Sequence, residues 1–114
     1  MTTAITDGGS ANPVQAAKPW TIEALRGRRD EILDLAARRG ARNVRVFGSV
    51  VRGDARPDSD IDLVVDFDAG RSLLDHGGLI MDLQDALGCK VDVLSARGMR
   101  PRLRLEVEAE AVSL

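Results

Sequence analysis

The segment Ile61–Phe67, with the sequence IDLVVDF, limits the possible folds of this chain more than any other part. Its residues are mostly apolar and strongly β-forming, so they favour a strand. A strand with this composition is typical of the centre of a sheet that is covered on both faces. The chain must therefore provide further strands beside this one and helices to pack on them.

Strands and helices are predicted to alternate along the rest of the chain. Short β-forming segments predict two further strands, at residues 43–47 and 90–94. Apolar residues at helical spacing predict three helices, at residues 21–39, 72–87 and 99–111, with a break or kink where the second contains Gly77-Gly78. The predicted fold class is α/β (α+β), a small mixed sheet of three or four strands with helices packed on it.

The length and composition describe a small globular protein. A chain of 114 residues fits one folded domain, at residues 20–114, while residues 1–19 lack periodicity and are predicted to form a mobile tail. The formal net charge of −2 argues against stable binding of nucleic acid through its phosphates. With one cysteine and no apolar signal or membrane segment, the chain is expected in the cytoplasm.

Two acids, Asp60 and Asp62, stand at the start of the predicted central strand. Side chains two residues apart in a strand point the same way, about 6–7 Å apart at the backbone. Two neighbouring carboxylates raise each other's pKa unless a cation is present, and Mg²⁺ prefers such hard oxygen ligands. Asp92 lies between two valines in a later strand. If the two strands are neighbours, the three carboxylates can hold two metal ions, as in phosphoryl-transfer sites.

A Gly48-Ser49 turn follows the strand predicted at residues 43–47. Gly48 permits close approach of the backbone to a ligand, and the Ser49 hydroxyl and the free N–H groups of the helical turn after it attract phosphate. Arg52 can donate to a phosphate, although such an arginine bonds a carbonyl or faces water about equally often. A nucleoside triphosphate with Mg²⁺ suits both the acids and this turn.

The stretch GSVVRGDARPDSDIDL resembles the GSx10DxD motif of the nucleotidyltransferase superfamily related to DNA polymerase beta. The short chain and the later KVDV are similar to the minimal nucleotidyltransferase (MNT) branch of that superfamily. The resemblance implies that Gly48 and Ser49 hold the triphosphate. It also implies that Asp60 and Asp62 bind both Mg²⁺ ions, and that Asp92 ligates the catalytic ion and helps to deprotonate the attacking hydroxyl.

The reaction that this resemblance implies is attack of an acceptor hydroxyl on the α-phosphate of ATP, with release of pyrophosphate. Many MNT proteins are antitoxins that add AMP to a tyrosine of a HEPN-type toxin. The chain is therefore expected to be a protein adenylyltransferase in a hetero-oligomer with such a toxin. Two alternatives stay open: an antitoxin that neutralises its toxin by binding alone, and a free-standing transferase that modifies a metabolite.

Several other residues are expected to be structural or solvated. His76, the only histidine, is predicted to lie on a helix surface, and Asp66 is predicted to face solvent near the end of its strand. Leu73 and Leu74 are expected on the apolar face of their helix.

Overall fold

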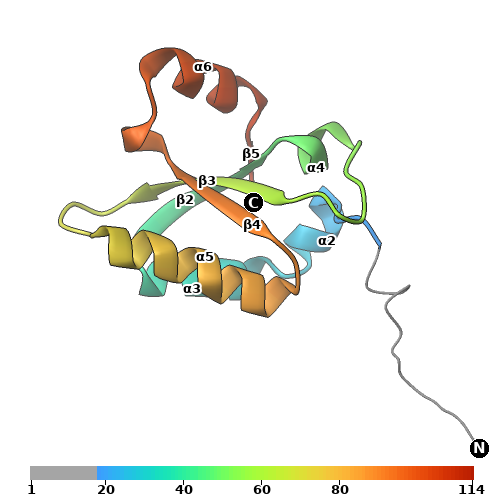
Figure 1. Ribbon diagram of the computed structural model, residues 1–114, viewed down its shortest axis with the longest axis horizontal. Helices are drawn as coiled ribbons and strands as arrows, with labels where there is room; N and C mark the ends of the chain where they lie inside the picture. Colours follow the sequence, from blue (N-terminus) through green and yellow to red (C-terminus); the bar gives the residue numbers. More distant parts are fainter. Residues whose placement is uncertain (1–17) are drawn as a thin grey trace, which may run out of the picture.

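The computed structural model describes residues 18–114, so most of the predicted N-terminal tail lies outside the described residues (Figure 1). The elements in chain order are α2 (Ile22–Arg26), α3 (Arg29–Arg38), β2 (Ala41–Phe47), α4 (Ser49–Arg52), β3 (Ile61–Phe67), α5 (Leu73–Leu87), β4 (Val91–Ser95), the 3₁₀ turn η2 (Ala96–Gly98), α6 (Pro101–Glu110) and β5 (Val112–Ser113). Within these residues, no helix has the length and apolar character needed to cross a membrane.

The strands form one four-stranded mixed sheet in the order β4-β3-β2-β5. β3 is parallel to β4 and antiparallel to β2, and β2 is also antiparallel to β5. β3 therefore lies inside the sheet, as its apolar sequence predicts. The predicted fold class is confirmed, and β5 is the strand that the sequence analysis did not find.

The two faces of the sheet have unequal cover. On one face, Ile61, Leu63 and Val65 belong to the larger cluster of buried side chains, which includes residues of α2, α3 and α5. Val64 points to the other face. Among the described residues, the buried cluster there consists of Val64, Ala96 and Val107, with a few partly buried side chains packed against it. Figure 1 shows the same arrangement, with α3 and α5 on one side of the sheet and α6 on the other. Because side chains alternate along a strand, Asp62 lies on the face that α6 covers.

The helix predicted at residues 21–39 is interrupted. α2 ends at Arg26 and α3 begins at Arg29, so the prediction of one continuous helix was wrong. Glycine is a weak helix former, and after Gly27 the chain tightens, with the Arg28 N–H donating to the carbonyl of Leu25 at 2.9 Å. The predicted helix start is confirmed, since the Thr21 hydroxyl accepts a hydrogen bond from the Ala24 N–H at 3.0 Å.

The glycine pair in α5 does not break the helix, which runs without interruption from Leu73 to Leu87. A Cβ atom at Gly78 would lie 2.5 Å from the guanidinium of Arg39. That guanidinium crosses the helix here, and its Nε donates to Asp82 at 2.8 Å. The absence of a side chain at Gly78 thus permits a close contact between two helices, and the predicted kink was wrong.

Three predictions for single side chains in α5 were also wrong. Leu73 and Leu74 are 87% and 84% exposed, because the buried face of α5 is formed by residues farther along it. His76 is not on a free helix surface. Its Nε2 lies 2.6 Å from the carbonyl oxygen of Val93, and its ring packs on Phe67 with the ring centroids 5.2 Å apart.

Candidate active site

The pairing of β3 with β4 brings the predicted acids together. Asp62 is the direct partner of Asp92 in the parallel register, and both are the second residue of their strand. Residues that are paired across two strands point to the same face of the sheet. Asp60 lies two residues before Asp62, just outside β3. The three acids therefore gather at the amino-terminal ends of two adjacent strands.

The electrostatics of Asp62 reflect this crowding. Burial raises the pKa of its carboxyl group above the ordinary value, and the negative charges of Asp92 and then Asp60 raise the pKa further. The charges of the three carboxylates are thus close enough to oppose one another. A cation at this position would relieve both the burial of the charge and the repulsion.

The Gly48-Ser49 turn lies directly against Asp62. Phe47 at the end of β2 is the register partner of Asp62, so Gly48 is the next residue along the chain. Gly48 has a φ of 80° and a ψ of −151°, a conformation that is essentially restricted to glycine. A Cβ atom here would lie 2.5 Å from Oδ2 of Asp62. The structure therefore brings the predicted phosphate turn and the predicted metal ligands into contact.

Arg52 is held in an ion pair within the same region. Its Nη1 lies 3.0 Å from Oε2 of Glu110, and its Nε lies 3.5 Å from a carboxylate oxygen of Asp54. The other oxygen of Glu110 accepts a hydrogen bond from the Gly48 N–H at 2.7 Å. This N–H and then the Arg52 guanidinium lower the pKa of Glu110. The charged form of Glu110 is thus favoured beside the candidate site.

Glu110 is the residue of this region that sequence reasoning missed. It is the last residue of α6, and the pairing of β5 with β2 carries that helix end to Gly48. β5 has only two residues, which is too short for a recognisable alternation of apolar and polar side chains. Without β5, the sequence gives no reason to place the end of α6 near the turn.

The donor chemistry of the site fits a divalent metal ion. Carboxylate oxygens are the ligands that Mg²⁺ prefers, and the pKa of Asp62 is raised by burial and then by the charges of Asp92 and Asp60, both of which a bound cation would offset. In residues 18–114, the present side-chain positions do not form a group of three or more acidic, histidine or cysteine side chains with metal-holding geometry. The fit therefore rests on the residue types and on their shared face of the sheet.

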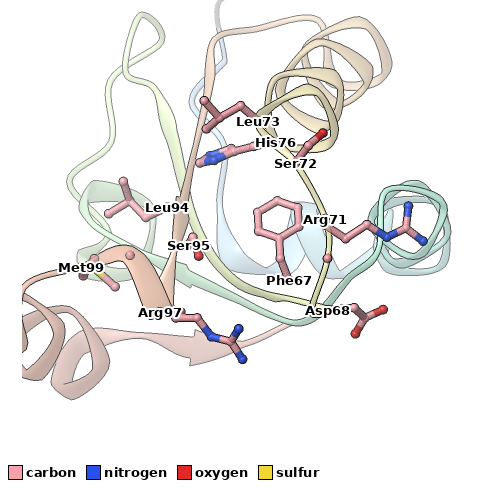
Figure 2. Close-up of a pocket in the computed structure, with 12 residues that line it drawn as sticks. Phe67, Asp68, Arg71, Ser72, Leu73, His76, Leu94, Ser95, Arg97 and Met99 are labelled. Atoms are coloured by element: carbon pink, nitrogen blue, oxygen red, sulfur yellow. The ribbon is translucent and has the colours of Figure 1, made fainter.

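A sizeable cavity among the described residues lies elsewhere. It has a volume of about 680 Å³ and lies at the carboxyl-terminal ends of β3 and β4, where its lining includes Phe67 of β3, His76 of α5 and Arg97 of η2. Figure 2 shows Arg97 and His76 in this cavity together with the ring of Phe67. Asp62 and Asp92 lie at the opposite ends of the same strands. The acids, rather than the size of a cavity, therefore define the candidate active site.

Residues 29–113 match the model of the nucleotidyltransferase domain, and the chain belongs to this family. Protein adenylyltransferase MntA of Thermococcus cleftensis is 39% identical over 79 residues, which cover 69% of this chain and 80% of that protein. A solved structure described as a minimal nucleotidyltransferase is 55% identical with a TM-score of 0.75, and the match covers 82% of this chain and 96% of the other. The predicted resemblance to the minimal nucleotidyltransferases is confirmed.

A more distant solved structure has the same fold. It is described as a tri-AMPylated HEPN toxin of Shewanella oneidensis in complex with an MNT antitoxin. The matched chain is 20% identical with a TM-score of 0.61, and the match covers 77% of this chain and 69% of that one. At this identity the likeness supports the fold of the sheet and its helices.

We expect the stability of the metal-free protein to depend on pH through Asp62. A folded-state pKa above the unfolded value of about 3.9 means that the folded protein binds the proton more tightly. This contribution to stability is present below about pH 3.9 and is lost as the pH rises through the raised pKa. The Asp62→Asn variant has no such proton to lose. In EDTA, the melting temperature of the variant minus that of the wild type should therefore increase as the pH rises. A difference that is constant from acidic to neutral pH would contradict the assignment.

Proposed function

We propose that this chain is a Mg²⁺-dependent protein adenylyltransferase that acts in the cytoplasm as an antitoxin. It transfers AMP from ATP to a tyrosine hydroxyl of a HEPN toxin with which it forms a complex. The observation that carries this proposal is the register of Asp62 with Asp92, directly against Gly48. Support also comes from a relative named protein adenylyltransferase and from the complex of an MNT antitoxin with an AMPylated HEPN toxin.

In this proposal two groups of residues bind the triphosphate of the nucleotide, one through metal ions and the other through hydrogen bonds. Asp60, Asp62 and Asp92 hold two Mg²⁺ ions, which when bound offset the negative charge of the triphosphate. The Gly48 N–H, the Ser49 hydroxyl and the Arg52 guanidinium donate hydrogen bonds to phosphate oxygens. A glycine is required because the carboxylate of Asp62 fills the space that a side chain at position 48 would need.

The reaction exchanges one phosphorus–oxygen bond for another. The acceptor hydroxyl oxygen forms a bond to the α-phosphorus, and the bond from that phosphorus to the oxygen that bridges to the β-phosphate breaks. Pyrophosphate leaves with the bonding electron pair, and the carboxylate of Asp92 accepts the proton of the hydroxyl. The protein contributes mainly by positioning the reactants and by stabilising the developing charge.

The test is mass spectrometry of a HEPN toxin encoded beside this chain, after incubation with the purified protein, ATP and Mg²⁺. We expect the toxin to gain the mass of one or more AMP groups and to lose its RNase activity. The control is the Asp60→Ala/Asp62→Ala double variant, which should still bind the toxin but leave its mass unchanged. Neutralisation by the double variant, with no adduct on any toxin molecule, would instead establish an antitoxin that acts by binding alone.

A further inference from the structure

The Glu110 carboxylate occupies the polar groups that the proposed function assigns to phosphate. Its Oε1 accepts from the Gly48 N–H at 2.7 Å and its Oε2 lies 3.0 Å from Nη1 of Arg52. Both oxygens of one carboxylate are thus used, one by a backbone N–H and one by a guanidinium. Phosphate oxygens accept the same two kinds of charge-assisted hydrogen bond.

The position of Glu110 is fixed by the sheet. Val112 of β5 is the register partner of Val46 in β2, and Gly48 lies two residues after Val46. The Ala111 N–H still donates to the Val107 carbonyl, so α6 is regular up to its last turn. The end of α6 is thus held by the helix before it and by the pairing of β5 with β2 after it. This backbone arrangement brings the Glu110 side chain to Gly48.

The Glu110 carboxylate is stabilised by its contacts with Gly48 and Arg52, but its wider surroundings are unfavourable for an acid. The last turn of α6 contains no basic residue, although the carboxyl-terminal end of a helix favours cations. Glu110 also adds a fourth negative charge to a region with three aspartates, and it is one of the groups that raise the pKa of Asp62. The Glu110 side chain is 32% exposed, so it can move away from Gly48 without unfolding the core.

We propose that Glu110 competes with the nucleotide phosphates for Gly48 and Arg52, and that it must release both groups before the triphosphate binds. The inference rests on the proposed function, because it takes Gly48 and Arg52 to be phosphate-binding groups. A carboxylate and a phosphate repel each other and cannot accept the same hydrogen bonds, so only one of them holds this position at a time. Glu110 thus weakens the binding of any phosphate that does not displace it.

The test is isothermal titration calorimetry of the full chain with two probes, ATP and inorganic pyrophosphate, both in the presence of Mg²⁺. We expect the Glu110→Gln variant to bind each probe about tenfold more tightly than the wild type, because the amide is a weaker competitor for Arg52 and lacks the negative charge. Adenosine, which has no phosphate, should bind the two proteins equally. The matched control is Glu106→Gln, which removes the same charge from an exposed position of α6.

The possible results separate the inference from the proposed function. If the wild type binds ATP and the Glu110→Gln variant binds it equally or more weakly, Glu110 is not a competitor and only the inference fails. An equal gain in affinity for the Glu106→Gln variant would mean that the loss of any negative charge on α6 has the same effect. This result would also overturn the inference. If no form of the protein binds ATP or pyrophosphate, the proposed function fails and the inference fails with it.

A second measurement uses the unsubstituted protein. Release of Glu110 by ATP and Mg²⁺ removes one of the contacts that hold the end of α6. Amide hydrogen exchange in residues 109–113 should therefore become faster when the nucleotide binds. Slower exchange in this segment would mean that Glu110 keeps its contacts in the complex, which would contradict the proposal.

Discussion

Replacement of Asp62 by asparagine is expected to lower the rate of AMP transfer about a thousandfold, since a metal-ion clamp contributes several kcal/mol to phosphoryl transfer. The same change should raise the melting temperature of the metal-free protein at neutral pH. Asp62 is charged there at the cost of burial and of repulsion from Asp92 and Asp60, and asparagine carries no charge. The rate is measured by mass spectrometry of the toxin, and the stability by thermal unfolding in EDTA.

Asp66 provides a matched control for this prediction. It lies on the same strand and the same face as Asp62, but it accepts hydrogen bonds from Asn43 at 2.9 Å and from Arg45 at 3.2 Å. The Arg45 side chain is only 13% exposed, so the loss of its partner leaves a nearly buried charge with less compensation. Asp66→Asn should therefore lower stability and leave AMP transfer almost unchanged. Equal loss of activity in both variants would place the reaction elsewhere or show that any acid in β3 is needed.

The second large effect is expected for Gly48→Ala. A Cβ atom at this position would lie 2.5 Å from Oδ2 of Asp62, so either the carboxylate or the turn must shift. A displacement of about 1 Å in a reacting group can reduce a rate about a hundredfold. We therefore expect a loss of this size in AMP transfer. An alanine in the backbone conformation of Gly48 should also lower the free energy of unfolding by about 1–3 kcal/mol.

The Gly53→Ala variant distinguishes the effect of backbone strain from the effect of a Cβ atom that contacts Asp62. Gly53 also has a φ of 80°, but no atom outside its chain neighbours lies within 4 Å of a Cβ built on it. Alanine at position 53 should cost about 1–2 kcal/mol in stability through its left-handed conformation and leave the rate nearly unchanged. If both variants lose activity to the same extent, destabilisation rather than displacement of Asp62 is responsible. Unfolding in urea, alongside the rate assay, distinguishes the two cases.

Local sequence patterns were sufficient to predict the centre of the fold. The strand Ile61–Phe67 has the predicted bounds, because a run of β-forming residues between two polar loops leaves little choice of register or length. Its neighbour was predicted at residues 90–94 and is Val91–Ser95. Once these two strands are adjacent, their alternating apolar residues are buried on one face, and Asp62 and Asp92 then share the other face. This is why the arrangement of the acids followed from the sequence.

Features that depend on tertiary contacts were not predictable in the same way. The absence of a side chain at Gly78 in α5 accommodates the Arg39 side chain, which comes from the end of α3. The contact of Glu110 with Gly48 depends on a two-residue strand at the far end of the chain. In both cases the two contacting residues are more than 30 residues apart in the sequence, so no short sequence pattern predicts the contact.

The unequal packing of helices on the two faces of the sheet affects which part of this protein unfolds locally. The face packed by α3 and α5 contains most of the buried apolar side chains, whereas the face beneath α6 has the small cluster around Val64. Detachment of α6 therefore exposes less apolar surface to water than detachment of the opposite helices, and it costs less free energy. Asp60 and Asp92 are already exposed in the folded protein, whereas Asp62 is partly buried. A local fluctuation of α6 can therefore expose Asp62 more fully while the rest of the domain stays folded, so that access to this carboxylate and global unfolding become separate events.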